Sequence, residues 1–327
     1  MSKEVIRTMI QKAQKSPKRV VYPEGEEDKI IRAAVTSMED GIANPILLGD
    51  DKIIKGKLDA LGVGLEGITI IDPLQAKTSE TYMNEFYKVR ERKGMSLRLA
   101  KNLLKQPNYF GSMMVKLGHA DALISGLTTS YPETIRPALQ CLGVKEGFNV
   151  ASGLYIVITK KDVYFFADTT VNVNPTSEEL AEIAISTADT VKRFDIEPRV
   201  AMLSFSNFGS APMPESVKVK EAVEIVKKTR PDIMIDGEMQ ADTAVVPQIR
   251  ETDFPFSTLK GKPNVLVFPD LNSGNIAYKL MARIGGAEVI GPVLMGISKP
   301  VHVLQRGASV EDIINMTAIA VVEASQK

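Results

Sequence analysis

The stretch "DALISGLTTSYPETIRPALQ", residues 121–140, joins a short apolar run to a hydroxyl-rich loop and then to a helical pattern. The apolar run does not alternate with polar residues, which is typical of a strand covered on both faces in an α/β sheet. Thr128, Thr129 and Ser130 follow it, and Arg136 lies on the predicted helix beyond them. A buried strand that leads through a loop into a helix is the repeating unit of α/β proteins, so this stretch predicts the fold class.

Apolar runs of the same kind recur along the 327 residues, with helical patterns between most of them. The runs predict strands within residues 19–23, 44–49, 68–72, 121–127, 154–159, 163–168, 199–206, 264–270, 288–296 and 301–305. Only three residues, "KKD", separate the strands predicted at 154–159 and 163–168. So short a connection indicates an antiparallel hairpin, and we therefore expect a mixed sheet in that region.

Composition bounds the class of protein. The length favours two domains, and the glycines of "CLGVKEG", residues 141–147, predict a boundary there, with a second crossing near residues 291–300. The 40 basic and 40 acidic residues cancel, which argues against a nucleic-acid binder. One cysteine excludes a disulfide framework and fits a reducing compartment. Because the sequence shows no signal peptide and no long apolar segment, we expect a cytoplasmic protein without a membrane span.

Polar loops follow three of the predicted strands. In α/β sheets, ligands bind outside the carboxyl ends of strands, and hydroxyls, amides and helix N-termini there suit an anion. The alternative is that these side chains only cap turns and helices. The candidates in residues 124–140, 204–223 and 268–280 are Thr128, Thr129, Ser130, Ser206, Asn207, Asn272, Ser273 and Asn275.

The stretch "PVHVLQRGASVEDIINM", residues 300–316, offers a second kind of site. Ser309 and Asp312 have the spacing of a helix capping box, which would explain Asp312 without any chemistry. Arg306 is harder to explain, because it follows a predicted buried strand, where an unpaired charge is costly. The stretch is therefore either a capped helix start or the edge of an active site.

Other reactive residues carry weaker signals. His119 and His302 are the only histidines and do not have metal-ligand spacing, so we predict no metal site. Cys141 has no histidine near it in the sequence and is predicted to pack in the core. Neither of the common glycine-rich nucleotide-binding motifs is present.

Taken together, several stretches resemble the phosphate acetyl/butyryltransferase family, whose members exchange CoA and phosphate on an acyl group. They occur in family order along nearly the whole chain and form a specific set. The matching stretches are "VVYPEGEEDKIIRAA" (20–34), "VRERKGM" (89–95), residues 120–140, "FFADTTVNVNPTSEELAEIA" (165–184), "DGEMQAD" (236–242), residues 268–280 and "GPVLMGISKPVHVLQRGASVEDI" (291–313).

The resemblance implies roles for individual residues. Arg90, Arg136 and Arg306 match family arginines that hold phosphate and the developing oxyanion, as preorganised cations should. Asp312 matches the aspartate proposed to deprotonate the thiol of CoA, whose thiolate attacks the carbonyl carbon of acetyl phosphate. A carboxylate is a weak base for a thiol, so nearby positive charge must stabilise the thiolate.

Three departures from the family pattern leave the function open between two classes. Gln305 stands where active members usually have serine, and Thr169 stands where they usually have cysteine. The glutamine amide can still donate a hydrogen bond, so we include Gln305 among the expected catalytic residues. The third departure is "SFSNFGS" (204–210), which replaces a loop that usually carries serine, threonine and lysine. These departures resemble the C-terminal domain of hybrid malic enzymes, which is thought to sense acetyl-CoA with little or no transfer.

The resemblance also implies an architecture. We expect two α/β domains with a cleft between them, like the isocitrate and isopropylmalate dehydrogenases, with residues 1–142 and 297–327 forming the first domain. Residues 143–296 form the second, through which the family usually dimerises, so a homodimer or higher homo-oligomer is expected. The expected ligands are CoA, acetyl-CoA, phosphate and acetyl phosphate, with no cofactor, no nucleic acid and no membrane as partner.

Overall fold

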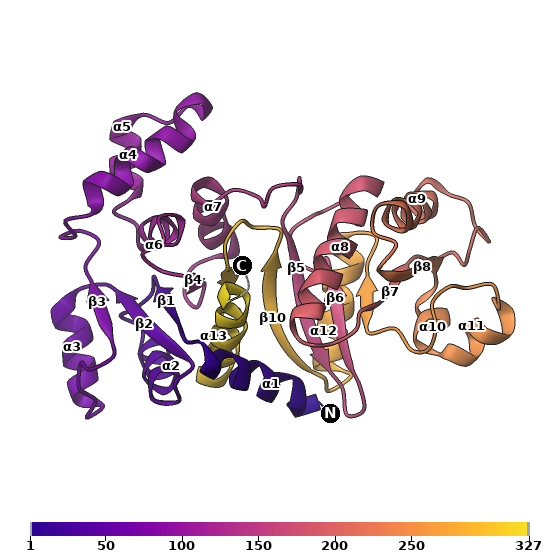
Figure 1. Ribbon diagram of the computed structural model, residues 1–327, viewed down its shortest axis with the longest axis horizontal. Helices are drawn as coiled ribbons and strands as arrows, with labels where there is room; N and C mark the ends of the chain where they lie inside the picture. The colour runs from indigo at the N-terminus through magenta and orange to yellow at the C-terminus, as the bar shows by residue number, and fades with distance from the viewer. Residues whose placement is uncertain (1, 326–327) are drawn as a thin grey trace. The chain divides into compact units, whose positions relative to one another are not determined.

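The computed structural model describes residues 2–325 (Figure 1). The chain divides into two compact units. One, here called the terminal unit, consists of residues 6–145 and 297–325. The other, here called the central unit, consists of residues 146–296 with residues 2–5.

The terminal unit is built on a five-stranded parallel sheet with the order β11-β4-β1-β2-β3. Each strand overlaps one of the predicted apolar runs; β1, β2, β4 and β11 are mostly buried, whereas the edge strand β3 is partly exposed. Their bounds are β1 Lys18–Tyr22, β2 Ala43–Leu48, β3 Thr69–Ile71, β4 Ala122–Ser125 and β11 Val301–Val303.

Helices cover both faces of this sheet. Successive residues of a strand point to opposite faces: Val21 belongs to the core cluster under α6, while the hydroxyl of Tyr22 bonds that of Thr317 on α13 at 2.8 Å. The sheet therefore lies between α6 on one face and α13 on the other. The helices assigned to this part of the chain are α1 Ser2–Lys15, α2 Asp28–Glu39, α3 Asp51–Ala60, α4 Ser79–Arg90, η1 Glu91–Lys93, α5 Leu97–Leu103, α6 Pro107–Lys116, α7 Tyr131–Cys141 and α13 Val310–Ser325.

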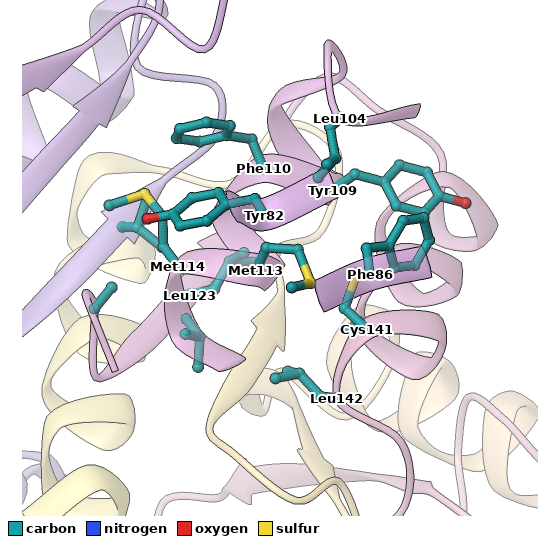
Figure 2. Packing of buried hydrophobic residues seen from close by; sticks show 14 of the residues in the cluster. Tyr82, Phe86, Leu104, Tyr109, Phe110, Met113, Met114, Leu123, Cys141 and Leu142 are labelled. Carbon is teal, nitrogen blue, oxygen red and sulfur yellow. The ribbon is translucent and has the colours of Figure 1, made fainter. Parts of the chain in front are cut away.

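The core beneath α6 also fixes the helix that carries Arg90 (Figure 2). Tyr82 and Phe86, one turn apart on α4, are buried against aromatic rings of α6, with ring centroids 4.9 Å apart for Tyr82 and Phe110. Phe86 lies 5.5 Å from Tyr109 in the same way. Cys141 is buried in this cluster, as the sequence predicted.

The central unit contains a six-stranded mixed sheet with the order β10-β5-β6-β9-β7-β8. The predicted hairpin is confirmed, because β5 pairs with β6 in antiparallel register; β10 pairs antiparallel with β5, and the remaining pairs are parallel. The strands are β5 Ser152–Ile158, β6 Val163–Ala167, β7 Arg199–Leu203, β8 Met234–Met239, β9 Val265–Val267 and β10 Glu288–Met295.

Adjacent phenylalanines on β6 show that this sheet is also covered on both faces. Phe165 contacts Phe194 at the end of α8, while Phe166 contacts Phe268 in the cluster that includes Tyr278 of α12. The helices are α8 Ser177–Arg193, α9 Pro214–Thr229, α10 Ala241–Val245, α11 Pro247–Asp253 and α12 Leu271–Arg283. A capping box of Thr176 and Glu179 begins α8.

Strand β8, "MIDGEM", is absent from the predicted strands because polar residues interrupt its apolar pattern. Asp236 is buried but accepts hydrogen bonds from Lys227 at 2.7 Å and from the Ser257 hydroxyl at 2.7 Å. Glu238 is buried as well and accepts a hydrogen bond from the Ser206 hydroxyl at 3.0 Å. These partners lie far away in the sequence, so the pattern alone did not reveal that a strand could accommodate the two carboxylates.

Candidate active site

The carboxyl ends of β1, β4 and β11 meet at one edge of the terminal unit's sheet, because these three parallel strands are neighbours. Glu24 follows β1, the loop at residues 126–130 follows β4, and Gln305 and Arg306 follow β11. Leu304 N–H donates to the Ser125 carbonyl at 2.7 Å and extends the pairing of β11 with β4. This edge is where α/β sheets bind ligands.

Close packing at this edge requires a glycine at position 126. Its φ is 110°, in the region that favours glycine, and an added Cβ would lie 2.8 Å from Val303 Cγ1. A side chain there would push β4 away from β11, so Gly126 keeps the two strand ends together.

The loop after β4 is wrapped around the carboxylate of Glu24. Backbone N–H groups of Gly126 and Leu127 donate to Oε2 at 2.7 and 2.9 Å. Thr128 donates its N–H and its hydroxyl to Oε1, both at 2.7 Å, and the N–H of Thr129 donates at 3.1 Å. The backbone donors that the sequence offered to an external anion are thus bound to an internal one.

The ionised form of Glu24 is favoured in this setting. Burial acts to raise the pKa of Glu24, but the hydrogen bonds from Thr128, Leu127 and Gly126 outweigh it and hold that pKa below its ordinary value. Sequence reasoning missed Glu24. Its only signal was a carboxylate directly after a predicted strand in the motif at 20–34, and its partners lie about a hundred residues further along the chain.

Ser130 begins α7 and forms a capping box with Glu133, whose Oε2 accepts the Ser130 N–H at 2.8 Å. The capping alternative is therefore confirmed for Ser130. A role in substrate binding stays a prediction for Thr128, Thr129 and Ser130.

Arg306 lies in a tight turn after β11. The Ala308 N–H donates to the Gln305 carbonyl at 3.1 Å, and Gly307 has a φ of 80°, which glycine adopts without strain. Gln305 and Arg306 are both exposed. The argument that burial of Arg306 would be costly is therefore wrong, because the chain has left the buried strand before the guanidinium is reached.

Arg90, Arg136 and Arg306 lie around the same helix, α7. The positive charges of Arg306 and Arg136 help to lower the pKa of Glu133 on α7, which is lowered mainly by its bonds to Ser130. Burial raises the pKa of Tyr109, and the charges of Arg136 and Arg90 oppose that rise. Arg136 lies on α7 itself, and α7 contacts both α4, which carries Arg90, and β11, which directly precedes Gln305 and Arg306. The structure therefore places the segments that carry the three predicted arginines against one helix.

These three guanidinium groups have no hydrogen-bonded acidic partner among the described residues, although the Glu133 carboxylate interacts electrostatically with Arg136 and Arg306. Within residues 2–325 none of them forms an ion pair or a hydrogen bond, and Nε of Arg90 is buried without a partner. Arg136 and Arg306 are exposed, so their guanidinium groups are accessible to an anionic ligand. The arrangement suits a phosphate or an acyl phosphate, which a guanidinium can bind through two parallel hydrogen bonds.

Asp312 is confirmed as a member of a capping box at the start of α13. Its Oδ2 accepts the N–H and the hydroxyl of Ser309, both at 2.8 Å, and its own N–H donates to the Ser309 hydroxyl at 3.1 Å. Among the described residues no hydrogen bond involves Oδ1. The cap therefore fixes the carboxylate while leaving one oxygen available to accept a proton.

In the central unit, the loop after β7 is held by internal hydrogen bonds. The buried Ser206 donates to Glu238, and the Ala211 N–H donates back to the Ser206 hydroxyl at 3.1 Å. The Asn207 Oδ1 accepts the Gln240 N–H at 2.7 Å. Both predicted binding residues thus stabilise their own loop in this structure, and ligand binding by them stays a prediction.

The N-terminal end of α12 behaves similarly. The Ser273 hydroxyl donates to the Asp270 carbonyl at 2.9 Å, and Asn275 Nδ2 donates to the Thr169 carbonyl at 3.1 Å. Asn272 is exposed. Thr169 is completely buried, and its hydroxyl donates to the Gly153 carbonyl at 3.0 Å, so this departure from the family pattern serves the packing of the sheet.

No helix within residues 2–325 has the length and apolar character needed to cross a bilayer. The described side chains contain no group of three or more His, Cys, Asp and Glu placed to hold a metal ion. The fold and the arginine cluster define an α/β protein built to bind a small anionic ligand at the carboxyl ends of parallel strands.

The chain belongs to the phosphate acetyl/butaryl transferase family, whose model matches residues 4–321. It is similar to the phosphate acetyltransferase of Clostridium acetobutylicum, with 41% identity over 330 residues that cover 99% of each chain. It is also similar to the NADP-dependent malic enzyme of Escherichia coli, with 40% identity over 325 residues. That match covers 98% of this chain but only 43% of the malic enzyme.

Solved structures give the same result. A phosphotransacetylase from Streptococcus pyogenes has a TM-score of 0.96 and 40% identity, and the match covers 100% of both chains. A structure described as a 4-hydroxythreonine-4-phosphate dehydrogenase from Salmonella typhimurium has a TM-score of 0.56 at 12% identity, covering 94% of this chain and 99% of that one. The second match concerns the fold alone and confirms the predicted dehydrogenase-like architecture.

Proposed function

We propose that the chain is a phosphate acetyltransferase that interconverts acetyl-CoA plus phosphate with CoA plus acetyl phosphate. The observation that carries the proposal is the set of Arg90, Arg136 and Arg306 around α7, none of which forms an ion pair or a hydrogen bond within residues 2–325. Family membership supplies the reaction, and the full-length match to an acetyltransferase of similar length supports it.

In the direction of acetyl-CoA synthesis, Asp312 takes the proton of the CoA thiol. The thiolate attacks the carbonyl carbon of acetyl phosphate, and the negative charge that develops on the carbonyl oxygen is stabilised by Arg306 and by the amide of Gln305. The bond between the carbonyl carbon and the phosphate oxygen then breaks. Phosphate is the leaving group, and the arginines bind it. The free Oδ1 of Asp312 supports its role as the base.

CoA itself is the second ligand of this proposal. Its phosphates would add negative charge near Arg90 and Arg136. A calorimetric titration with CoA and with acetyl-CoA tests binding without turnover. Absence of heat and of a thermal shift at millimolar ligand would contradict the proposal, since a ligand of the native state must raise its apparent melting temperature.

A second function, acetyl-CoA sensing without transfer, is favoured by Gln305 and by the similarity to a malic enzyme over most of this chain. Thr169 does not support this alternative, because its side chain is buried in the sheet. The two functions differ in one outcome: an enzyme forms acetyl-CoA from acetyl phosphate and CoA, whereas a sensor only binds acetyl-CoA.

We also propose that the protein is cytoplasmic, from its single cysteine, and that it forms a homodimer through the central unit. Ile276 and Leu280 lie four residues apart on α12, and Ile284 follows at the same interval directly after the helix ends; they are 56%, 51% and 81% exposed. An apolar stripe on an exposed helix face suits a protein interface. The other face of α12 packs on the sheet through Tyr278 and Met281.

A further inference from the structure

The connection between β1 and α2 contacts both loops that lead to the site arginines. Glu24, at its start, accepts the N–H groups of residues 126–129. Lys29, in the first turn of α2, donates from Nζ to the Ala308 carbonyl at 2.9 Å and to the Gly307 carbonyl at 3.5 Å. One short segment thus contacts two neighbouring strand ends with charges of opposite sign.

Each contacted loop is continuous with an arginine. The loop held by Glu24 runs directly into α7, which carries Arg136. The carbonyls held by Lys29 belong to the two residues that follow Arg306. The position of either arginine relative to the other therefore depends on how these loops sit against the β1–α2 connection.

We propose that Glu24 and Lys29 are positioning residues that hold Arg136 and Arg306 at the spacing needed to bind one phosphate or acyl phosphate. The proposal rests on the function proposed above. Preorganisation matters here because misplacing a catalytic group by about 1 Å can cost about 10²-fold in rate. Exposed loops would not reach that precision unaided, so the structure supports them from a helix and a strand end.

The chemistry of each residue matches its partners. A carboxylate presents only acceptors, and Glu24 faces four backbone N–H groups and the hydroxyl of Thr128. A glutamine would turn an NH₂ group toward some of these donors. Lysine presents only donors and faces two carbonyls, so neither residue can be exchanged for a neutral one without leaving backbone groups unsatisfied.

The arrangement also refines where the anion binds. Because Glu24 already uses the N–H groups of residues 126–129, a phosphate cannot occupy them while Glu24 remains in place. The ligand is bound beside the loop by arginine side chains, and the loop serves as their support. The lowered pKa of Glu24 is consistent with a carboxylate that stays ionised in this position.

The first test is structural and does not depend on activity. Amide hydrogen exchange is compared among the wild type, Glu24→Gln and the control Glu27→Gln, whose side chain makes no cap hydrogen bond in the same segment. We expect exchange at residues 126–129 to rise at least about tenfold in Glu24→Gln, because hydrogen bonds to charged groups are the stronger ones. Unchanged exchange at these four amides, or the same rise in Glu27→Gln, would overturn the proposal for Glu24.

The second test asks whether each residue acts through its arginine. Lys29→Met should lower kcat/KM for acetyl phosphate by about 10²-fold, and most of that loss should disappear in an Arg306→Lys background, since coupled residues are not additive. Glu24→Gln should couple to Arg136→Lys in the same way. Lys29→Arg, which keeps the donors, should restore most of the activity, and Lys52→Met, an exposed lysine on α3, should have no effect. Fully additive losses, or a wild-type rate for Lys29→Met, would overturn the proposal.

The same single and double variants, which form double-mutant cycles, are compared by calorimetric titration with inorganic phosphate, which needs no turnover. If the wild type shows no transfer but binds phosphate, the proposed function fails while the cycles still decide the positioning proposal. If the wild type transfers acetyl groups and the cycles are additive, the positioning proposal fails alone. If phosphate does not bind at all, both fail, because there is then no arginine site to position.

Discussion

The Glu24 carboxylate accepts both the backbone N–H and the hydroxyl of Thr128, each at 2.7 Å, although the two residues lie 104 positions apart in the sequence. This pair links the ends of β1 and β4 through the protein's own side chain and backbone. The loop that leads to Arg136 is therefore ordered by the protein's own charge, and binding energy from a substrate is not needed to order it.

The first prediction concerns stability and pH. Because the folded-state pKa of Glu24 lies below its ordinary value of 4.5, its ionised form contributes stability that is present above that value. This contribution is lost as the pH falls through the lowered folded-state pKa. Wild type should therefore melt above Glu24→Gln at pH 7, and the gap should narrow in acid below pH 4.5. Thermal denaturation measures this difference in melting temperature between the wild type and Glu24→Gln. A difference that stays constant across the acid range would contradict the expectation.

Arginine geometry should matter beyond charge. Arg136→Lys and Arg306→Lys keep the positive charge but lose the planar fork, so each should weaken acetyl phosphate binding at least about tenfold. Initial-rate kinetics with varied acetyl phosphate measure the effect as a rise in KM or a fall in kcat/KM. Arg32→Lys, an exposed arginine on α2, is the matched control and should behave as wild type. Unchanged kinetics in both site variants would show that Arg136 and Arg306 do not bind acetyl phosphate.

Gln305 decides between the two functions. If the protein is an enzyme with a displaced donor, Gln305→Ser should preserve or raise the rate, since loss of one well-placed oxyanion donor costs about 10²–10³-fold. If it is a sensor, the wild type should bind acetyl-CoA without turnover and the serine should restore little. We predict measurable activity in the wild type. A fall of a hundredfold or more in Gln305→Ser would show that the glutamine itself is the required donor.

The exposed stripe on α12 predicts the effect of a charge at its most exposed position. Ile284→Lys should shift a dimer toward monomer in size-exclusion chromatography with light scattering, because an unpaired charge would be buried in the interface. Ile53→Lys is the control, because Ile53 is 45% exposed on α3 of the other unit. A dimer that survives Ile284→Lys unchanged would place the interface elsewhere.

Most of the fold could be predicted from the sequence because its strands are buried on both faces and therefore appear as uninterrupted apolar runs. The exception, β8, contains Asp236 and Glu238, whose partners come from distant segments. The hairpin of β5 and β6 was predictable because its turn is local in sequence. Burial of a charged strand residue is not local, so no pattern within the strand could indicate it.

The candidate site was predictable only in part. The resemblance identified Arg90, Arg136 and Arg306, and the structure places them around one helix. The role of Glu24 could not be predicted, since hydrogen bonds to a loop about a hundred residues away depend on strand order. The exposure of Arg306 was also missed, because the pattern does not show that β11 ends at Val303.

The central claim is that this chain transfers acetyl groups with Asp312 as the base. The direct measurement is the initial rate of acetyl-CoA formation from acetyl phosphate and CoA for the wild type, Asp312→Asn and Ser309→Ala. Ser309→Ala removes the cap, worth about 1 kcal/mol of stability, but keeps the carboxylate. The account predicts a clear wild-type rate, a loss of at least about 10²-fold in Asp312→Asn and a rate near wild type in Ser309→Ala. A wild-type rate equal to that of Asp312→Asn, with acetyl-CoA binding intact, would contradict it.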